Sequence, residues 1–368
     1  MRIRKTMMGA VLALVLLPLP FAQAESEFKY DILELPAVPS DKAATSMIYT
    51  VKKFGDRYFA TGHQGHIIYS EDGGDTWTQA QVPVRSSLLD IAFPTPEKGW
   101  AVGHEGVILH TEDGGKTWVK QYDGLRYGKD GLAYYQKLAE ENPDNEAFPH
   151  YVGEMEFAIG QGADKPFFRV ECLSEKQCYA LGAYGMLVLT EDGGETWEPR
   201  LHTVENDSFY HVFDFSPLPG DGRFFLAGEA GLFMVADVSN PDKEQRYAKK
   251  IHSIPWEGSF FTSTDTADGA IVMGGLRGRM FRTADVGDTW VVVEKPPTSA
   301  IVDSIRLADG RLVAVGVAGE VLVSRDNGFS YTRADVGEVG RANAVAEGPG
   351  NTLLLGSPYG IKKVTLPQ

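Results

Sequence analysis

One octet, Ser70–Trp77 with the sequence Ser-Glu-Asp-Gly-Gly-Asp-Thr-Trp, recurs along this chain and constrains its fold more than any other feature. The shared pattern is S/T-x-D-x-G-x-x-W/Y, and its copies are Ser70–Trp77, Thr111–Trp118, Thr190–Trp197, Thr283–Trp290 and Ser324–Tyr331. Internal repeats indicate a fold assembled from similar units, so they take priority over the assignment of any single element.

The residues of the octet predict a tight link between two antiparallel strands. An Asp side chain accepts hydrogen bonds from backbone N–H groups just after it, Gly tolerates the positive φ of a turn, and the aromatic residue packs back over the turn. We therefore interpret the following residues as structural rather than catalytic: Asp72, Trp77, Asp113, Trp118, Asp192, Trp197, Asp285, Trp290, Asp326 and Tyr331.

A second repeat, a short apolar strand followed by G-x-x-G or a close variant, precedes each octet and also occurs where the octet is missing. Its leading glycines are Gly62, Gly103, Gly182, Gly228, Gly274, Gly316 and Gly356. Most of these intervals are close to about 40 residues, the length of one four-stranded propeller blade. The sequence therefore predicts an all-β fold, a seven-bladed β-propeller of four-stranded antiparallel blades, as a single domain spanning residues 25–368.

The last repeat has three strand-like runs, not four, before the sequence ends at Gln368. The alternating run Phe28–Leu35 precedes the first blade. A strand added from the other end of the chain would remove an exposed sheet edge. We expect this N-terminal strand to complete the seventh blade and close the ring.

The interval between Gly103 and Gly182 is nearly twice as long as the others, which places an insertion at residues 123–165. Apolar residues at helical spacing predict a helix over Asp130–Asn142, which Pro143 ends. The second half, Tyr151–Gly162, is mixed apolar and Gly-rich. Strand direction puts the insertion on the same face of the propeller as the G-x-x-G turns, opposite the octets.

This face carries the variable loops, where binding residues are most often found. The candidate partner-binding residues are His63, His104, Glu105, Tyr184, Glu229, Arg277, Arg279, Tyr135 and Tyr151. The turn residues among them are expected to converge on the mouth of the channel, and the alternative is that they are ordinary exposed turn residues. The histidines lack metal-ligand spacing, so we expect neither a metal site nor a cofactor.

Residues 1–24 have the pattern of a secretory signal peptide. Arg2, Arg4 and Lys5 form a basic region, Met7–Leu17 is apolar, and Ala22–Ala24 is an A-x-A cleavage site. We expect a periplasmic protein that is soluble after cleavage, because no later stretch of about 20 apolar residues predicts direct insertion into a membrane. A formal net charge of −15 disfavours nucleic acid as a partner.

The two cysteines, Cys172 and Cys178, flank a short turn between two strand-like runs. In an exported protein this spacing predicts a disulfide bond that joins a hairpin. A redox role is the alternative.

Together, the octets, the A-x-G-x-x-G strands and the count of seven resemble the photosystem II assembly/stability factor family of propellers, which has sialidase-type Asp-box (BNR) repeats. The insertion at 123–165 and the run Pro255–Phe261 are similar to the non-photosynthetic bacterial branch, whose members tend to be exported and are often encoded beside resistance-nodulation-division transporters. The resemblance implies a non-catalytic assembly or accessory factor for a membrane protein complex, without photosystem II as the client. The strongest local matches are Trp100–Gly103 with Thr111–Trp118, and Tyr179–Gly182 with Thr190–Trp197.

Two other functions are compatible with a propeller that carries these octets. One is a glycoside hydrolase of Asp-box type, which needs two carboxylates at a defined separation among the 50 acidic residues. The other is a binder of glycans or small molecules at the channel mouth. Against the hydrolase, no F-R-I-P segment occurs near the N-terminus. We predict a non-catalytic scaffold that is a monomer on its own.

Overall fold

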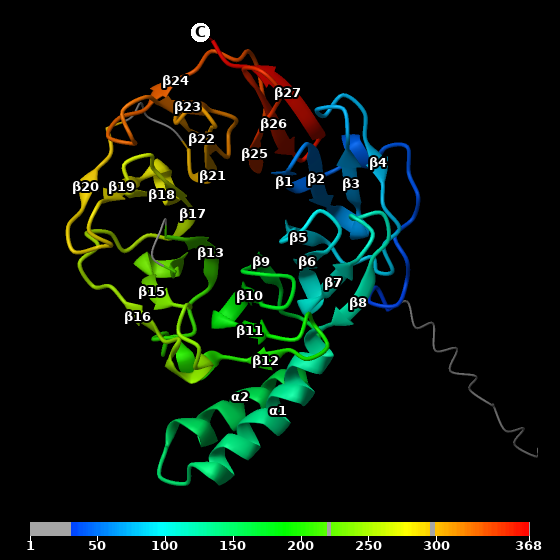
Figure 1. The fold of residues 1–368 in the computed structure, drawn as a ribbon, viewed down its shortest axis with the longest axis vertical. Coiled ribbons are helices and arrows are strands. Elements are labelled where there is room, and N and C mark those ends of the chain that lie inside the picture. Colours follow the sequence, from blue (N-terminus) through cyan, green and yellow to red (C-terminus); the bar gives the residue numbers. More distant parts are fainter. Residues whose placement is uncertain (1–30, 219–221, 295–298, 368) are drawn as a thin grey trace, which may run out of the picture. The chain divides into compact units, whose positions relative to one another are not determined.

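The computed structural model describes residues 31–218, 222–294 and 299–367, and its strands form seven antiparallel sheets arranged in a ring (Figure 1). Within each sheet the strands follow one another in chain order. The first strands of successive sheets contact each other around the ring, and the first sheet also contacts the seventh. The seven-bladed all-β propeller predicted from the sequence is confirmed.

The strands of the first four blades have the following bounds: β1 (Ile48–Phe54), β2 (Arg57–Gly62), β3 (Ile67–Ser70), β4 (Thr78–Gln79); β5 (Leu88–Ala92), β6 (Gly99–Gly103), β7 (Ile108–Thr111), β8 (Val119–Tyr122); β9 (Phe167–Cys172), β10 (Cys178–Gly182), β11 (Leu187–Thr190), β12 (Glu198–Pro199); β13 (Val212–Pro217), β14 (Arg223–Gly228), β15 (Phe233–Asp237), β16 (Ala248–Lys250). Those of the last three are: β17 (Phe260–Asp265), β18 (Ile271–Gly275), β19 (Met280–Thr283), β20 (Val291–Val292); β21 (Ile301–Arg306), β22 (Leu312–Gly316), β23 (Val321–Ser324), β24 (Thr332–Arg333); β25 (Ala344–Glu347), β26 (Thr352–Ser357), β27 (Gly360–Thr365).

The second strand of each blade lies deepest in the protein. All five residues of β6, β10, β18 and β22 are buried, because both faces of these strands are covered by the neighbouring blades. Near-continuous apolar runs are what a strand buried on both faces requires. The G-x-x-G repeat therefore marks the core of each blade.

The octets form hydrogen-bonded turns between the third and fourth strands of five blades. In the second blade, Asp113 Oδ1 accepts hydrogen bonds from the Lys116 and Thr117 backbone N–H groups at 3.0 and 2.9 Å. The Trp118 indole N–H donates to the Gly115 carbonyl at 3.0 Å. The Asp113 carboxylate thus accepts hydrogen bonds within its own turn. In the fifth blade, hydrogen bonds from Thr289 lower the pKa of the equivalent Asp285 to about 2.

Among the residues that the structure describes, the seventh sheet has three strands, and no fourth strand from the N-terminal side pairs with it. Asp31–Leu35 forms a turn in which the Leu33 backbone N–H donates to Asp31 Oδ1 at 3.0 Å, while Phe28–Tyr30 lie outside the described residues. Leu33 is buried against the first two blades, not the seventh. For Asp31–Leu35, the predicted strand is replaced by this side-chain-capped turn.

Side-chain packing closes the ring instead. The Asn343 amide donates to the Ile48 carbonyl at 2.8 Å, and Ile48 packs with residues of β25 and β26. The outer strand β27 carries the exposed Lys362 and Lys363, and Lys363 pairs with Asp75 at 2.8 Å. Lysines on an edge strand oppose pairing with the edge of another sheet.

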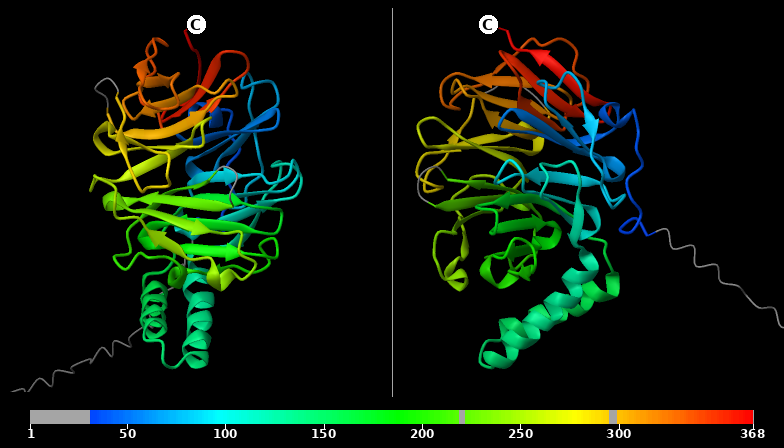
Figure 2. Two further views of the ribbon diagram at one scale, coloured as in Figure 1. Left: turned by 60° about the vertical axis from the view of Figure 1, so that its left-hand side comes forward. Right: turned by 45° about the vertical axis from the view of Figure 1, so that its right-hand side comes forward.

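The insertion is a hairpin of two helices, α1 (Gly124–Glu141) and α2 (Ala147–Gln161), and Figure 2 shows that it extends beyond the ring of sheets. The predicted helix was therefore too short, and the second helix was missed. A Cβ at Gly128 would lie 2.9 Å from Ile159 Cγ1, and one at Gly131 would lie 2.4 Å from Met155 Sδ. These glycines allow the two helices to approach closely, although glycine lowers helix propensity in the sequence.

A disulfide bond joins Cys172 and Cys178, which are paired across β9 and β10 with their Cα atoms 4.1 Å apart. This bond confirms the hairpin disulfide predicted from the sequence. Among the described residues, no helix has both the length and the apolar character needed to cross a membrane.

Candidate functional site

The G-x-x-G turns of the first five blades share one backbone conformation. Each is a short 3₁₀ turn whose middle residue has a left-handed φ of 52 to 57°, and these residues are Gln64, Glu105, Tyr184, Ala230 and Arg277. A positive φ is uncommon for residues other than glycine. The turns therefore present one side chain per blade from a fixed backbone on one face of the propeller.

The candidate residues on these turns do not assemble into a single site. His63 Nδ1 lies 2.9 Å from Ser87 Oγ in the first blade, whereas Glu229 accepts a hydrogen bond from the His211 backbone N–H at 3.2 Å in the fourth. In the fifth blade Arg277 is exposed, and the Arg279 guanidinium lies 5.6 Å from the Trp256 ring. The first strands of the blades enclose a pocket in the central channel, and none of these residues lines it.

His104 and Glu105 lie where the insertion leaves the second blade. His104 is exposed, and a Cβ at Gly124 would lie 3.0 Å from the Glu105 carbonyl oxygen. The 3₁₀ turn that holds both residues contacts α1. The insertion therefore starts beside a G-x-x-G turn, on the face that strand direction indicated.

Tyr135 was expected to face a partner, and the structure corrects this expectation. Its side chain is fully buried, and its hydroxyl accepts a hydrogen bond from the Leu201 backbone N–H at 2.9 Å. The same oxygen lies 3.2 Å from His202 Nδ1. Because its spacing placed Tyr135 on the apolar face of α1, this side chain packs against the propeller and anchors the hairpin.

Arg200 provides a second anchor for the hairpin. Its guanidinium is 2% exposed and donates to Tyr134 Oη at 2.9 Å and to Glu244 at 2.7 Å. Burial raises the pKa of Glu244, but hydrogen bonds from Arg200 and His202 outweigh burial and lower that pKa to about 2. Burial and the nearby Arg200 charge lower the pKa of His202, so its imidazole is neutral at pH 7.

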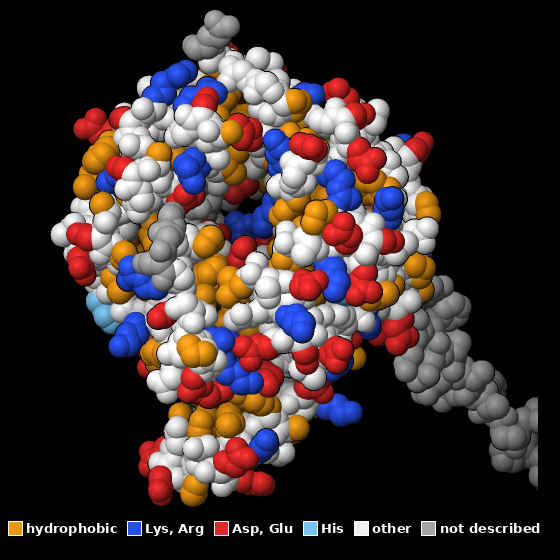
Figure 3. Space-filling model, in the orientation of Figure 1, with side chains coloured by type: hydrophobic (Ala, Val, Ile, Leu, Met, Phe, Trp, Pro, Cys, Tyr) orange, Lys and Arg blue, Asp and Glu red, His pale blue; other side chains and the backbone are white. Residues whose placement is uncertain are grey.

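The central channel is lined by the first strands of the blades and holds a network of charges, seen as blue and red side chains around the opening in Figure 3. Lys52 pairs with Asp90 at 2.7 Å, and Arg169 Nε lies 3.2 Å from Asp214. Burial raises the pKa of Glu171 to about 7. The pocket here is about 160 Å³, smaller than the roughly 300–1,000 Å³ typical of ligand sites.

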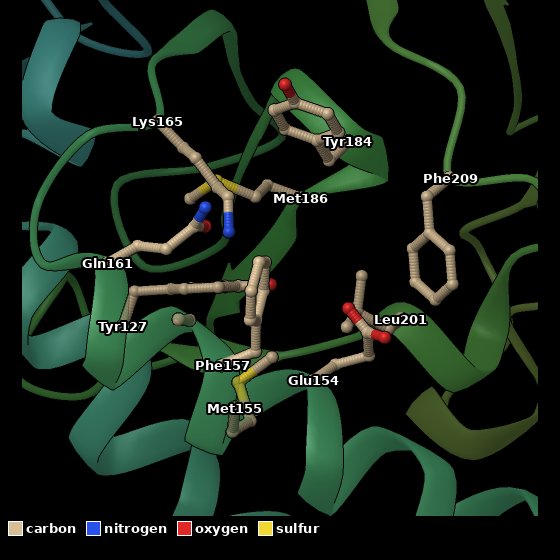
Figure 4. A pocket seen from close by; sticks show the side chains of 11 residues that line it. Tyr127, Glu154, Met155, Phe157, Gln161, Lys165, Tyr184, Met186, Leu201 and Phe209 are labelled. Carbon is tan, nitrogen blue, oxygen red and sulfur yellow. The ribbon is translucent and has the colours of Figure 1, made fainter.

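A larger pocket of about 360 Å³ lies between α2 and the third blade (Figure 4). It is mostly apolar, with polar groups at its edges, and its lining residues are Tyr127, Glu154, Met155, Phe157, Ala158, Gln161, Lys165, Tyr184, Met186, Leu201 and Phe209. Phe157 and Tyr184 flank it with exposed fractions of 59% and 53%. We name this the hairpin pocket.

A second pocket of about 200 Å³ shares Leu201 and Phe209 with the hairpin pocket and adds Tyr151 to its lining. The shared wall is the loop that carries Phe209, whose φ of 51° is a left-handed value rarely adopted by an aromatic residue. The Asn206 side chain fixes this loop by hydrogen bonds to the Tyr210 backbone N–H and carbonyl. Backbone strain of this kind clusters at functional positions.

Of the predicted candidates, Tyr184 and Tyr151 thus lie at adjoining pockets. The sequence did not single out Tyr127, Phe157, Lys165 or Phe209. The clearest missed signal was an insertion with large apolar residues in its Gly-rich half, where a solvated loop would be polar. Within the described parts of the chain, no group of three or more His, Cys, Asp or Glu residues is placed to hold a metal ion.

Comparisons with known proteins agree with the propeller geometry. The sequence profile of the family described as "Photosynthesis system II assembly factor YCF48" matches residues 72–142 and 159–343. No curated protein matches the sequence. The gap in the profile match, residues 143–158, contains most of α2.

Similar solved structures share the fold at low identity. "YCF48 bound to D1 peptide" is 16% identical, with 91% of this chain and 100% of that chain covered at a TM-score of 0.62. YCF48 from Cyanidioschyzon merolae is 14% identical, with 89% and 97% covered at a TM-score of 0.61. The WD40 β-propeller domain of Doa1 is 12% identical, with 91% and 96% covered at a TM-score of 0.60.

Proposed function

The chain belongs to the family described as photosynthesis system II assembly factor YCF48, and from this premise we propose that it is an exported, non-catalytic assembly or accessory factor. It docks on a membrane protein complex in the cell envelope through the face that carries the G-x-x-G turns and the helical hairpin. The client that the sequence resemblance favours is a transporter of the resistance-nodulation-division type. The family supports the scaffold role, and the signal-peptide pattern of residues 1–24 supports export.

The observation that carries this proposal is the hairpin pocket. It is an apolar hollow on the same side as the turns, flanked by the exposed aromatic rings of Phe157 and Tyr184. Exposed apolar side chains gathered around a pocket mark protein-binding sites more often than isolated ones do. The rigid propeller positions the hairpin, and the hairpin contributes the variable surface.

A peptide is the form in which we propose that the client is recognised. One of the similar structures is of YCF48 bound to a D1 peptide, which shows that a propeller of this shape holds a peptide in that protein. In this chain, the hairpin pocket and its neighbour adjoin at Leu201 and Phe209 and together offer a site for such a segment.

The test is affinity purification of the tagged mature protein from detergent-solubilised envelopes. The intact protein is compared with a variant in which a short Gly-Ser linker joins Asp123 to Ala163. The ends of the hairpin lie together, since a Cβ at Gly124 would be 2.8 Å from Ala163 Cα, so the linker leaves both flanking strands in place. Circular dichroism and thermal unfolding establish that the shortened variant retains the propeller.

A membrane protein that co-purifies with the intact form and is lost with the shortened form supports the proposal. A membrane protein retained equally by both forms shows that the hairpin is not the docking site. Recovery of no membrane protein with either form contradicts the accessory role.

A further inference from the structure

We propose that the hairpin pocket is an anchor site for a partner peptide in which a large apolar side chain lies next to a carboxylate. The apolar side chain fills the floor of the pocket, and the carboxylate accepts hydrogen bonds from Tyr127 and Lys165. This inference rests on the proposed function and specifies the chemistry of the segment that is recognised.

The floor of the pocket suits a side chain of variable shape. Met155 and Met186 are each 2% exposed and Leu201 is 5% exposed, and all three line the same hollow. Methionine side chains are flexible and polarizable, so they adapt to different apolar groups. A hollow of about 360 Å³ has room for one large side chain and part of its backbone.

Tyr127 supplies a polar group that lines the pocket. Its side chain is 4% exposed, lines the pocket, and makes no hydrogen bond to any residue that the structure describes. Figure 4 shows the Tyr127 side chain reaching into the pocket toward Phe157. Because this hydroxyl has no acceptor among the described residues, it can donate a hydrogen bond to a ligand that enters the pocket.

Lys165 supplies the positive charge at the edge of the pocket. Its ammonium lies 5.4 Å from the centre of the Phe157 ring and 5.6 Å from that of the Tyr184 ring. In the part of the chain that the structure covers, Lys165 makes no ion pair. A cation held over two exposed rings is available to a carboxylate on an incoming peptide.

Glu154 places a negative charge at the end of the pocket opposite Lys165. In Figure 4 its carboxylate lies toward Leu201 and Phe209, whereas the Lys165 ammonium lies toward Gln161 and Met186. An acidic group on the peptide is therefore favoured at the Lys165 end and disfavoured at the Glu154 end. The charge complementarity fixes the orientation of the peptide as well as its composition.

Part of the lining of this pocket lies outside the match to the family profile. Glu154, Met155 and Phe157 fall in residues 143–158, outside the match to the family profile. Tyr127 and Lys165 lie within the matched ranges on either side of that gap.

The test uses the full mature protein and a phage-displayed library of random 12-residue peptides as the probe. Selected sequences are synthesised, and their affinities are measured by fluorescence anisotropy together with versions in which Asp or Glu is replaced by Asn or Gln. The protein variants are Tyr127→Phe, Lys165→Gln and Lys165→Glu. Lys137→Gln is the matched control, because the Lys137 side chain is 72% exposed on α1 and does not line the pocket.

We expect selected peptides to combine Phe, Leu, Met or Trp with an adjacent Asp or Glu. Tyr127→Phe weakens their binding about tenfold, because it removes one hydrogen bond to a charged group. Lys165→Gln weakens it about two- to fivefold. Lys165→Glu shifts the selected charge from acidic to basic, and Lys137→Gln leaves binding unchanged.

The inference is overturned if the library yields no peptide that needs the hairpin, if acidic residues are not enriched, or if Tyr127→Phe and Lys165→Glu bind the selected peptides as well as the unmodified protein does. A membrane protein that co-purifies with Lys165→Glu but not with the shortened hairpin would preserve the proposed function and reject this pocket chemistry.

Discussion

The Tyr135 hydroxyl accepts a hydrogen bond from the Leu201 backbone N–H at 2.9 Å, and this bond fastens the helical hairpin to the chain that follows the third blade. Both residues are buried. The orientation of the hairpin, and with it the shape of the hairpin pocket, therefore depends on a polar contact inside an apolar interface. A buried polar contact in which every donor and acceptor is hydrogen-bonded favours a single packing arrangement of the elements it joins.

Tyr135→Phe is expected to lower the free energy of unfolding by about 1 to 3 kcal/mol, because it leaves the buried Leu201 N–H without an acceptor. Urea denaturation followed by tryptophan fluorescence measures the change. Tyr359→Phe is the control, since Tyr359 is 76% exposed and should leave stability unaltered. Equal stability of the two variants would show that the hydroxyl does not anchor the hairpin.

Glu244→Gln is expected to destabilise the protein by about 2 kcal/mol, because the buried Arg200 guanidinium loses its charged partner while Glu244 itself is 45% exposed. The pKa of Glu244 falls from 4.5 to about 2 on folding, so its contribution is present above pH 4.5 and is lost as pH falls toward 2. Thermal unfolding between pH 2 and 7 should show this loss in the unmodified protein and a smaller one in Glu244→Gln.

The contribution of Glu171 to stability is expected to depend on pH in the opposite way to that of Glu244. Burial raises the pKa of Glu171 from 4.5 to about 7, so its contribution to stability is full below pH 4.5 and is lost as pH rises through 7. Among its channel neighbours, Asp90 and Asp214 reinforce this rise, while Lys52 and Arg169 oppose it.

The Glu171→Gln variant should therefore be about 1 to 3 kcal/mol more stable than the unmodified protein at pH 8 and nearly equal to it at pH 4.5. Chemical denaturation at the two pH values checks this difference. The exposed Glu195→Gln serves as the control and should change stability little at either pH. A destabilised Glu171→Gln at pH 8 would show that the ionised carboxylate supports the channel network.

Asp113→Ala is expected to cost about 1 to 2 kcal/mol, because Asp113 accepts hydrogen bonds from the Lys116 and Thr117 backbone N–H groups in the turn of the second blade. Glu112→Ala, at the exposed position beside it, should have little effect. Differential scanning calorimetry distinguishes the two. Peptide binding at the hairpin pocket should be unchanged in both variants, since the turn lies outside that pocket.

The blade count was predictable because it depends on local chemistry that repeats. Each octet contains its own turn-forming groups, and the spacing of Gly62, Gly103 and their equivalents measures the length of a blade directly. The described part of the predicted N-terminal strand, Asp31–Leu35, is a turn instead. An alternating pattern describes strand propensity, but the burial of Leu33 against the first two blades is a tertiary contact that the pattern does not contain.

The hairpin pocket was not predictable in this way. Gly128 and Gly131 lower helix propensity, and only the packing of Ile159 and Met155 against them shows why they are there. Tyr127 and Lys165 are far apart in the sequence and meet because two helices return the chain to the third blade. The placement of Tyr127 and Lys165 in one pocket depends on the fold and not on a sequence motif.

The central claim, docking of a membrane protein on the hairpin face, is tested most directly by site-specific photo-cross-linking in living cells. A benzoylphenylalanine is placed at Phe157, at Tyr184, or at the exposed Val292 on β20, the outermost strand of the fifth blade. The account predicts that an integral membrane protein of the envelope cross-links at positions 157 and 184 and not at 292. Cross-links to that protein at 292 alone, or no membrane protein at either hairpin-face position, would contradict it.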